Sequence, residues 1–442
     1  MTNTDARTPT PSELVLAAAS WLTAPQTRLV FDILEAAGFT VRAVGGTVRN
    51  TLLGEPVSDI DLAVDASPHD VMNAAKRAGL KVVPTGITHG TVTIIVEGIP
   101  FEVTTLRQDV STDGRRATVA YTNDWNADAE RRDFTINAIY CDRNGALLDP
   151  VGGLADISRR HVRFIGDPHA RIREDYLRIL RFFRFSAKYA GGLLDPDGLA
   201  ACINERSGLQ RLSAERVHHE FLRLLDAPFC IPVIECMAEH GFVADLIGTK
   251  GNIAALASLV ANAAVTSMPR QLDDAVMRLA ALAIAAPEDT TRLKDRLRLS
   301  NSETERITRA ATVATSINPQ SSTPLVHELI YRNGNDAVCD GIALAWARDT
   351  TANAAQLDDK VAHQVVDPSA NVYANLLTSA LNWVAPALPI SGRDVVACGV
   401  APGPRVSTVI NDFERWWIDT GFTQDKERIE EKLSELVVVT NQ

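Results

Sequence analysis

The stretch from Gly45 to Asp65, GGTVRNTLLGEPVSDIDLAVD, restricts the fold of this chain more than any other. Two glycines lead into a predicted helix over residues 47–53, and an apolar strand is predicted over residues 59–64. Because successive side chains of a strand alternate between its faces, Asp59 and Asp61 point the same way. Two like charges this close repel, and a bound divalent cation is the usual remedy. A glycine pair that opens a helix suits an oligophosphate, so the stretch predicts a site for a metal-bound nucleoside triphosphate.

The length and charge of the chain limit its partners. At 442 residues it is long enough for about two to four domains. A net charge of −11 argues against a protein that binds nucleic acid through a generally basic surface. Residues 159–184 nevertheless contain eight arginines against three acidic residues. We expect this basic band, and not the total charge, to decide whether a polyanion binds.

The sequence predicts neither a membrane span nor secretion. No apolar run approaches the ~18 residues that a spanning helix needs. Residues 1–13 are polar and lack the basic start and apolar core of a secretory signal. The six cysteines are scattered, and their spacing fits no common zinc signature. We therefore expect reduced thiols in a cytoplasmic protein.

The order of strand and helix patterns predicts an α+β fold. Strands are expected at residues 40–44, 59–64, 81–83, 90–96 and 99–106, with helices over 14–38 and 67–78. This order indicates a mixed sheet and not a repeating βαβ unit, so the glycine pair is a poor dinucleotide-binding fingerprint. The polar residues 109–129 are expected to form a mobile loop. Beyond Ala155 the pattern is almost all helical, with one helix expected from Asp167 to about Tyr189.

Two further groups of residues fit phosphate chemistry. Glu102 lies in an alternating strand, and if that strand adjoins the strand of Asp59 it completes a cluster of three carboxylates. The alternative is a half-buried acid paired with an arginine. Carboxylates that hold two Mg²⁺ ions about 3.5–4 Å apart support phosphoryl or nucleotidyl transfer. Arg131-Arg132-Asp133 adds cations for phosphate beside an acid that can hold a ribose hydroxyl.

The segment from Arg173 to Arg184 carries residues that can recognise a base. On one continuous helix Asp175, Arg178 and Arg181 fall within a sector of about 120° and can converge on one ligand. Cytosine and adenine both present an amino donor beside a ring-nitrogen acceptor, which an aspartate and an arginine match, whereas guanine and uracil present the opposite pattern. The alternative is a surface salt bridge. Farther on, Arg216 and Glu220 are expected to pair within one helix and brace its neighbours.

Five motifs in order over residues 45–225 carry a resemblance to a known family. They are GGTVRNTLLG…DIDLAV, RRDFTINA, DPVGGLADI, REDYLRILRFFRF and LSAERVHHEFLRLL. The chain resembles the class II CCA-adding tRNA nucleotidyltransferases and the bacterial poly(A) polymerases, of the DNA polymerase beta nucleotidyltransferase superfamily. One departure is visible: Asn50 stands where the first motif usually has aspartate, which we expect to weaken the support of Arg49 without loss of activity.

The resemblance implies a role for individual residues. Asp59 and Asp61 would hold Mg²⁺, with Glu102 as a further catalytic carboxylate. The nucleotide-binding residues would be Gly45, Gly46, Arg49 and Arg132 for the triphosphate, Asp133 and Asn137 for the ribose, Asp175 and Arg178 for the base, and Arg181 and Arg184 in the pocket wall.

The resemblance also implies domains, an activity and partners. The expected domains are an N-terminal lead and the start of the first helix (1–25), a five-stranded nucleotidyltransferase head (26–155), a helical neck with the nucleotide-selecting helix (156–225), a helical body (226–365) and an RNA-binding helical tail (366–442). The implied activity adds CCA to tRNA 3′ ends from CTP and ATP and releases pyrophosphate. The alternatives are a poly(A) polymerase, an enzyme that adds only CC or only A, and a non-catalytic RNA-binding descendant. The oligomeric state stays open.

Overall fold

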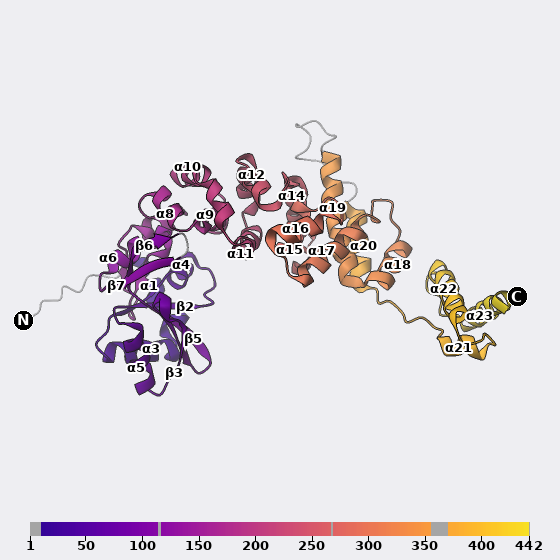
Figure 1. Ribbon diagram of the computed structural model, residues 1–442, viewed down its shortest axis with the longest axis horizontal. Helices are drawn as coiled ribbons and strands as arrows, with labels where there is room; N and C mark the ends of the chain where they lie inside the picture. Colours follow the sequence, from indigo (N-terminus) through magenta and orange to yellow (C-terminus); the bar gives the residue numbers. More distant parts are fainter. Residues whose placement is uncertain (1–9, 114–115, 267, 355–369, 442) are drawn as a thin grey trace, which may run out of the picture. The chain divides into compact units, whose positions relative to one another are not determined.

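A computed structural model describes residues 10–113, 116–266, 268–354 and 370–441 of the chain. Its contacts divide the chain into two units, Met1–Phe242 and Val243–Gln442. Every strand lies in the first unit, whereas the described elements that lie within the second are all helical (Figure 1). The predicted α+β fold, with a mixed sheet followed by helices, is confirmed. The predicted boundary between body and tail falls on residues outside the described ranges.

The sheet of the first unit has the order β3-β4-β5-β2-β1-β8-β9. Its strands are β1 (Val41–Val44), β2 (Ile60–Val64), β3 (Lys81–Gly86), β4 (Thr91–Val96), β5 (Ile99–Thr105), β8 (Tyr140–Cys141) and β9 (Leu147–Leu148). The pair β2–β5 is parallel and the other pairs are antiparallel, so the sheet is mixed. The five expected strands are present, but β8 and β9 extend the sheet beyond five. A two-residue strand such as β8 is too short to leave an alternating pattern in the sequence.

Helices near the N-terminus flank this sheet. They are α1 (Pro11–Ala17), α2 (Ser20–Thr23), α3 (Pro25–Ala36), α4 (Gly46–Leu53) and α5 (Pro68–Arg77). The single helix expected over residues 14–38 is therefore wrong, because the chain is extended at Ala24 and Pro25 starts a new helix. Helix α5 agrees with its prediction, since Ser67 caps it and the Ser67 hydroxyl accepts from the N–H of Asp70 at 3.2 Å.

The polar segment after β5 is ordered where the structure describes it. Strands β6 (Arg107–Asp113) and β7 (Arg116–Tyr121) pair antiparallel, and α6 (Trp125–Glu130) follows. The expectation of a mobile loop over residues 109–129 is thus wrong for the described part of that range. Pairing between two strands uses backbone groups, which polar composition does not reveal.

The first unit continues as helices. They are η2 (Thr135–Asn137), α7 (Gly153–Ser158), α8 (Pro168–Glu174), α9 (Leu177–Tyr189), α10 (Pro196–Asn204), η3 (Arg206–Arg211), α11 (Ala214–Leu225) and α12 (Cys230–Glu239). Helix α9 buries a row of phenylalanines, and Phe134 packs against Phe182 and Phe185 of this helix. This aromatic core packs α9 against the segment that contains Phe134.

The helix expected from Asp167 to Tyr189 is in fact two helices. Asp175 ends α8 with extended backbone angles (φ −155°, ψ 105°). Its carboxylate accepts from the N–H of Leu177 at 3.1 Å, so it serves the start of α9. An aspartate that bonds to nearby backbone in this way competes with helix continuation.

The remaining helices run from α13 (Phe242–Ile247) to the C-terminus. They are α14 (Ile253–Thr266), α15 (Ala275–Ala283), α16 (Asp289–Leu297), α17 (Asn301–Ala314), α18 (Thr323–Asn333), α19 (Asn335–Ala354), α20 (Ala370–Asn382), α21 (Gly392–Ala397), α22 (Pro404–Asp419) and α23 (Lys426–Asn441). Trp417 and Phe413 are fully buried in a core that joins α21, α22 and α23. Among the described residues, no helix has both the length and the apolar character to cross a membrane.

Candidate active site

The start of α4 approaches the aspartates of β2 because two glycines leave room there. Gly45 precedes α4 with φ 71°, a conformation that favours glycine. A Cβ atom on Gly45 would lie 3.7 Å from Oδ2 of Asp61, so a side chain here would fill the space beside that carboxylate. No side chain caps α4. Its first N–H groups are therefore suited to a phosphate.

Thr47 joins α4 to the aspartates. Its hydroxyl donates to the carbonyl oxygen of Asp59 at 2.9 Å and accepts from the N–H of Asp61 at 3.1 Å. Thr47 is 1% exposed, so these bonds lie in a dry environment. The sequence analysis missed this residue, and its only signal was its place directly after the glycine pair.

Asp59 and Asp61 differ in environment. Asp59 lies one residue before β2 and is exposed, whereas Asp61 lies within the strand and is half-buried. Burial raises the pKa of Asp61 to about 6; Glu102 and Asp59 add to the rise, and Arg132 opposes it. The carboxylate of Asp61 is thus ionised at neutral pH against the preference of its surroundings.

Glu102 lies on the neighbouring strand. In the parallel pairing of β2 with β5, Glu102 is opposite Asp61. Glu102 is exposed, and no ion pair joins it to an arginine within the part of the chain that the structure describes. The two strands are adjacent, but Asp59, Asp61 and Glu102 do not form a group that could hold a metal ion by itself among the described residues. The catalytic role of Glu102 stays a prediction.

The two aspartates fit a divalent cation by their chemistry. Carboxylate oxygens are the ligands that hard divalent ions prefer, and a cation here would relieve the repulsion that raises the pKa of Asp61. No three His, Cys, Asp or Glu side chains among the described residues form a group that could hold a metal ion alone. An ion at Asp59 and Asp61 would therefore need further oxygens, such as those of a triphosphate and water.

Arg49 is a buried guanidinium held by neutral oxygens. It is 7% exposed, and its Nη2 donates to Oδ1 of Asn50 at 2.9 Å and to the hydroxyl of Tyr189 at 2.8 Å. Its Nη1 donates to Oδ1 of Asn137, and its guanidinium lies 4.3 Å from the ring centre of Tyr189. Burial lowers the pKa of Arg49, an effect opposed by Tyr189. Because the bonding partners are neutral, the positive charge stays available to an anionic ligand.

Arg132 lies beside the glycine turn. Its Nη1 is 4.0 Å from the position of a Cβ atom on Gly45. Its Nη2 pairs with Asp128 at 3.0 Å, and its Nε donates to the hydroxyl of Tyr140 at 3.3 Å. Asp128, which the sequence analysis did not identify, also binds Arg131 at 2.6 Å and is 1% exposed. This buried acid fixes both arginines of the RRD motif.

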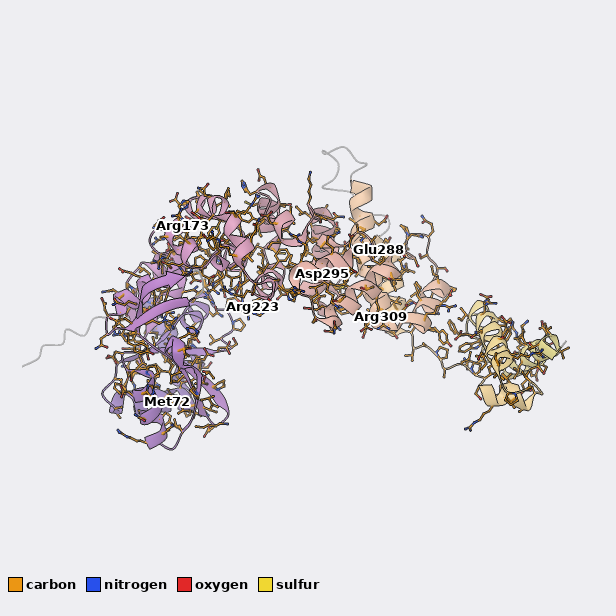
Figure 2. The ribbon with its side chains drawn as sticks, viewed as in Figure 1. Met72, Arg173, Arg223, Glu288, Asp295 and Arg309 are labelled. Carbon is orange, nitrogen blue, oxygen red and sulfur yellow. The ribbon has the colours of Figure 1, made fainter. Side chains whose placement is uncertain are left out.

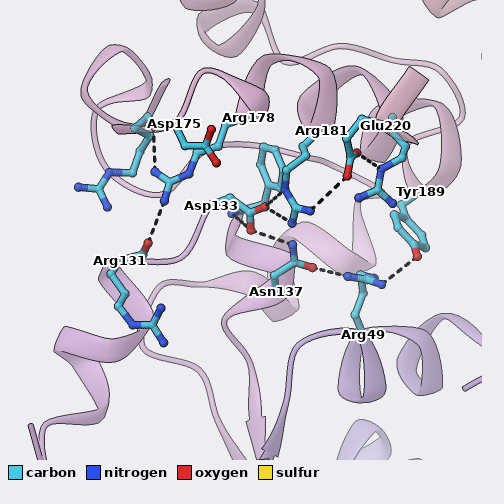
Figure 3. Close-up of polar contacts among 12 residues, drawn as sticks. Arg49, Arg131, Asp133, Asn137, Asp175, Arg178, Arg181, Tyr189 and Glu220 are labelled. Carbon is cyan, nitrogen blue, oxygen red and sulfur yellow. Dashed lines mark hydrogen bonds and ion pairs between the residues drawn. The ribbon is translucent and has the colours of Figure 1, made fainter. Parts of the chain in front are cut away.

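The predicted ribose residues belong to a buried polar row behind Arg49 (Figure 3). Asp133 accepts from Nε of Arg181 at 2.8 Å and from Nδ2 of Asn137 at 2.9 Å, and Asn137 contacts Arg49. Although burial opposes it, Arg181 and Asn137 hold the pKa of Asp133 well below its usual range. Arg181 also lies 3.8 Å from Glu220. The row links α9 to the residues of the glycine turn.

The expected convergence of Asp175, Arg178 and Arg181 on one helix face is wrong. Asp175 lies before α9, where its Oδ2 pairs with Nη2 of Arg216 at 2.7 Å. Arg178 pairs with Glu174 at 2.5 Å and donates to the carbonyl oxygen of Arg171 at 2.9 Å. Both side chains are thus bonded within the protein, and not to each other.

The expected pair of Arg216 with Glu220 is also wrong. Arg216 reaches Asp175 at the end of α8, and Glu220 binds Nε of Arg184 on α9 at 2.7 Å. Both side chains brace neighbouring elements, as predicted, but through partners outside their own helix. Sequence spacing shows only pairs within one helix, so these partners had no signal.

The basic band is less charged than its sequence indicates. Six of its eight arginines have ion-pair partners: Arg163 with Asp156, Arg171 and Arg178 with Glu174, Arg173 with Glu205, Arg181 with Asp133, and Arg184 with Glu220. Most of these acids lie outside residues 159–184. The band therefore serves largely to hold the first unit together.

A cavity of about 440 Å³ gathers part of the predicted site. Its described lining includes Gly46, Arg49, Asn50, Asp59, Asp61, Arg184, Lys188, Tyr189 and Arg223. The glycine turn, the aspartates and the end of α9 thus face one space. Asp175 and Arg178 do not line this cavity.

Comparison with known proteins identifies the family. A family model described as the poly A polymerase head domain matches residues 41–163. A mouse (Mus musculus) protein named CCA tRNA nucleotidyltransferase 1, mitochondrial, is 32% identical over 398 residues, which cover 88% of this chain and 85% of the relative. A CCA-adding enzyme of Limosilactobacillus fermentum is 29% identical, with coverage of 93% and 96%.

Solved structures agree with this relationship. The Bacillus stearothermophilus CCA-adding enzyme in complex with CTP has a TM-score of 0.71 and 27% identity, and the match covers 93% of this chain and 96% of that one. The Thermotoga maritima CCA-adding enzyme complexed with tRNA shares the fold, with a TM-score of 0.68, 20% identity, and coverage of 96% and 98%. The chain belongs to the family of CCA tRNA nucleotidyltransferases, the CCA-adding enzymes.

Proposed function

We propose that this protein adds CCA to the 3′ end of tRNA from CTP and ATP without a nucleic-acid template. The observation that carries the proposal is the cavity in which Asp59, Asp61 and Arg49 face one space beside the uncapped start of α4. This arrangement offers carboxylates for a cation, and a buried charge with N–H groups for a triphosphate. Relatives of similar length are named for CCA addition.

Different residues of this chain would bind the triphosphate and the metal ion. Gly45, Gly46 and Arg49 would bind the triphosphate, with Arg132 beside them. The 3′-hydroxyl of the tRNA attacks the α-phosphorus, the bond from that phosphorus to the bridging oxygen breaks, and pyrophosphate leaves. Enzymes of this family use divalent metal ions. We propose Mg²⁺ held by Asp59 and Asp61, where it would activate the attacking hydroxyl and stabilise the leaving oxygen.

Asp175 and Arg178 are the proposed base-selecting pair. An aspartate acceptor and an arginine donor match cytosine and adenine and oppose guanine and uracil. A mismatch leaves buried polar groups unpaired, which discriminates strongly. In the structure these side chains bind Arg216 and Glu174, so base selection requires them to change partners.

The proposed ligands are tRNA, CTP and ATP. A relative of 27% identity has been solved with CTP, which supports the same nucleotide here. We also propose a cytoplasmic location, because all six cysteines are free thiols, as is usual in a reducing compartment. Fractionation of the cells that make this protein would test the location, and recovery from an organelle would contradict it.

Nucleotide omission tests the proposed function. A tRNA transcript that ends at the nucleotide before CCA is incubated with Mg²⁺ and with CTP, ATP or both. CTP alone should add only C residues, and both nucleotides together should complete CCA. Long A tails from ATP alone would instead indicate a poly(A) polymerase. Completion of only one step would indicate a CC-adding or an A-adding enzyme.

A further inference from the structure

Of the cationic side chains around the active-site cavity, some have an ion-pair partner and others do not. Arg184 has Glu220 as its ion-pair partner at 2.7 Å. Arg49 is held by neutral oxygens, as described above. Lys188 and Arg223 line the same cavity as the acids Asp59, Asp61 and Asp226, yet no hydrogen bond or ion pair joins either side chain to another of the described residues. Lys188 and Arg223 thus lie in the lining without a bond to any of its described acids.

Lys188 and Arg223 come from different helices. Lys188 lies in the last turn of α9, and its Nζ is 5.3 Å from the ring centre of Tyr189. Arg223 lies in the last turn of α11 (labelled in Figure 2). Both side chains are exposed. Two helix ends that are distant in sequence therefore direct cations to one space.

Stabilisation of helix ends is the simpler explanation for each cation alone. A cation in the last turn of a helix interacts favourably with the helix dipole. That explanation does not account for a further feature. Arg223 lies close enough to Arg184 to act against its charge, and burial, the larger effect, also lowers the pKa of Arg184. Cations gathered in this way repel one another, and a bound anion would relieve that repulsion.

The two aspartates in the same cavity suggest that the anion bound by Lys188 and Arg223 belongs to the RNA. An RNA 3′ end that approaches Asp59 and Asp61 brings its own phosphates toward carboxylates, which repel them. The proposed triphosphate site already uses the start of α4 and Arg49 in this cavity. Lys188 and Arg223 line the same cavity and can supply cations to the phosphates of the growing RNA strand.

We propose that Lys188 and Arg223 bind a backbone phosphate of the RNA strand near its 3′ end and so hold the attacking hydroxyl at the aspartates. The site takes a phosphodiester of any sequence, because phosphate contacts position a strand and do not read its bases. This inference rests on the proposed function, since it assumes that an RNA 3′ end enters the cavity.

The test compares four variants with the parent protein: Lys188→Ala, Arg223→Ala, the double alanine variant and the conservative Lys188→Arg/Arg223→Lys variant. The dissociation constant for a tRNA transcript lacking CCA is measured at several salt concentrations without nucleotide, and KM for CTP is measured separately. We expect each alanine to weaken tRNA binding about 10-fold and to reduce the salt slope by about 1. KM for CTP should change less than about 2-fold, and the conservative variant should bind like the parent.

A modified RNA shows which phosphate Lys188 and Arg223 bind. Each of the last three internucleotide phosphates is replaced in turn by an uncharged methylphosphonate. At one of these positions the parent should lose about 10-fold in affinity, whereas the double alanine variant should lose nothing further. Independent losses at all three positions would overturn the inference.

Matched controls separate this role from helix stabilisation. Arg77→Ala removes an exposed cation from the last turn of α5, away from the cavity, and should leave tRNA binding unchanged. A rise in KM for CTP with unchanged tRNA affinity would assign Lys188 and Arg223 to the triphosphate and overturn the inference. So would unchanged values of both. If the parent binds tRNA but adds no nucleotide, the proposed function fails, while the binding measurements still decide the inference.

Discussion

The ionised carboxylate of Asp61 lowers the stability of the folded protein. Its pKa of about 6 in the folded protein exceeds the ordinary value of 3.8, mainly because of burial. The folded state therefore binds this proton more tightly than the unfolded state does. The stabilisation from the protonated carboxyl is complete below the ordinary pKa and is lost as the pH rises through about 6.

Asp61→Asn should accordingly stabilise the metal-free protein by ~2 kcal/mol at about pH 8 and by much less at about pH 4. Urea denaturation at both pH values, without divalent ions, measures the difference between variant and parent. Added Mg²⁺ should reduce the advantage at the higher pH, because the ion stabilises only the parent. An equal advantage at both pH values would refute the raised pKa.

Asp59 supplies the second carboxylate and has little structural role. It is exposed, and its side chain accepts a bond from the Ser58 hydroxyl at 2.8 Å. We expect Asp59→Ala to lower kcat at least about 1,000-fold because the cation would lose a ligand. The melting temperature should stay close to that of the parent.

The matched control for this variant is Ser58→Ala. It removes the neighbouring hydroxyl and should keep nearly full activity. An Asp59→Ala protein as active as the parent would overturn the assignment of the metal site.

At the scale of elements, Tyr189 connects α9 to the glycine turn. Its hydroxyl accepts from Arg49 at 2.8 Å, and its ring lies under the guanidinium. Tyr189→Phe keeps the ring and removes the acceptor, so Arg49 becomes less well oriented. We expect KM for CTP to rise about 3- to 10-fold, with a smaller change in kcat. Steady-state kinetics with saturating tRNA measures both, and an unchanged KM would contradict the positioning role.

Gly208 fixes the turn that contains Asp175. A Cβ atom at Gly208 would lie 1.9 Å from Cδ1 of Tyr176, the residue that follows Asp175. Gly208→Ala should therefore displace the ring and destabilise the protein by about 1–3 kcal/mol or more. Thermal unfolding measures the loss.

The control for that substitution is Gly392→Ala. A Cβ atom there meets Val406 at an ordinary 3.5 Å. Its melting temperature should change little. Equal effects of the two alanines would show that the close packing at Tyr176 is unimportant.

The elements also show what the sequence could predict. Local patterns predicted α4, α5 and β2, because their apolar spacing and caps lie within a few residues. The break at Asp175 was missed, since a helical apolar pattern continues across it. Partners such as Asp175 with Arg216, and Asp128 with Arg132, depend on tertiary packing and leave no mark in local spacing.

For the whole molecule, functional roles can be proposed for residues of the first unit but not for those of the second. The predicted catalytic residues and their partners lie in Met1–Phe242, where motifs, geometry and the family model coincide. Val243–Gln442 is helical as predicted, yet its sequence carried no comparable motifs. Packing of alanine- and leucine-rich helices can be predicted as a class, whereas a binding surface on such helices cannot.

Net charge gave a partial guide at this scale. Because the net charge is −11, we expect a polyanion to bind at a local group of cations and not over the whole surface. However, the arginines concentrated in residues 159–184 are mostly neutralised by acids brought from elsewhere in the fold. Lys188 and Arg223, which belong to no run of basic residues, line the cavity without an ion pair to another described residue.

The choice of C and A by protein side chains, without a nucleic-acid template, is the core of the proposed function. It is tested most directly by sequencing the 3′ ends of tRNA transcripts lacking CCA after incubation with this protein, Mg²⁺ and all four nucleoside triphosphates at equal concentration. We predict that the extended products end in CCA, with U and G rare. Products with mixed nucleotides, or with tails of A beyond the third position, would contradict the account.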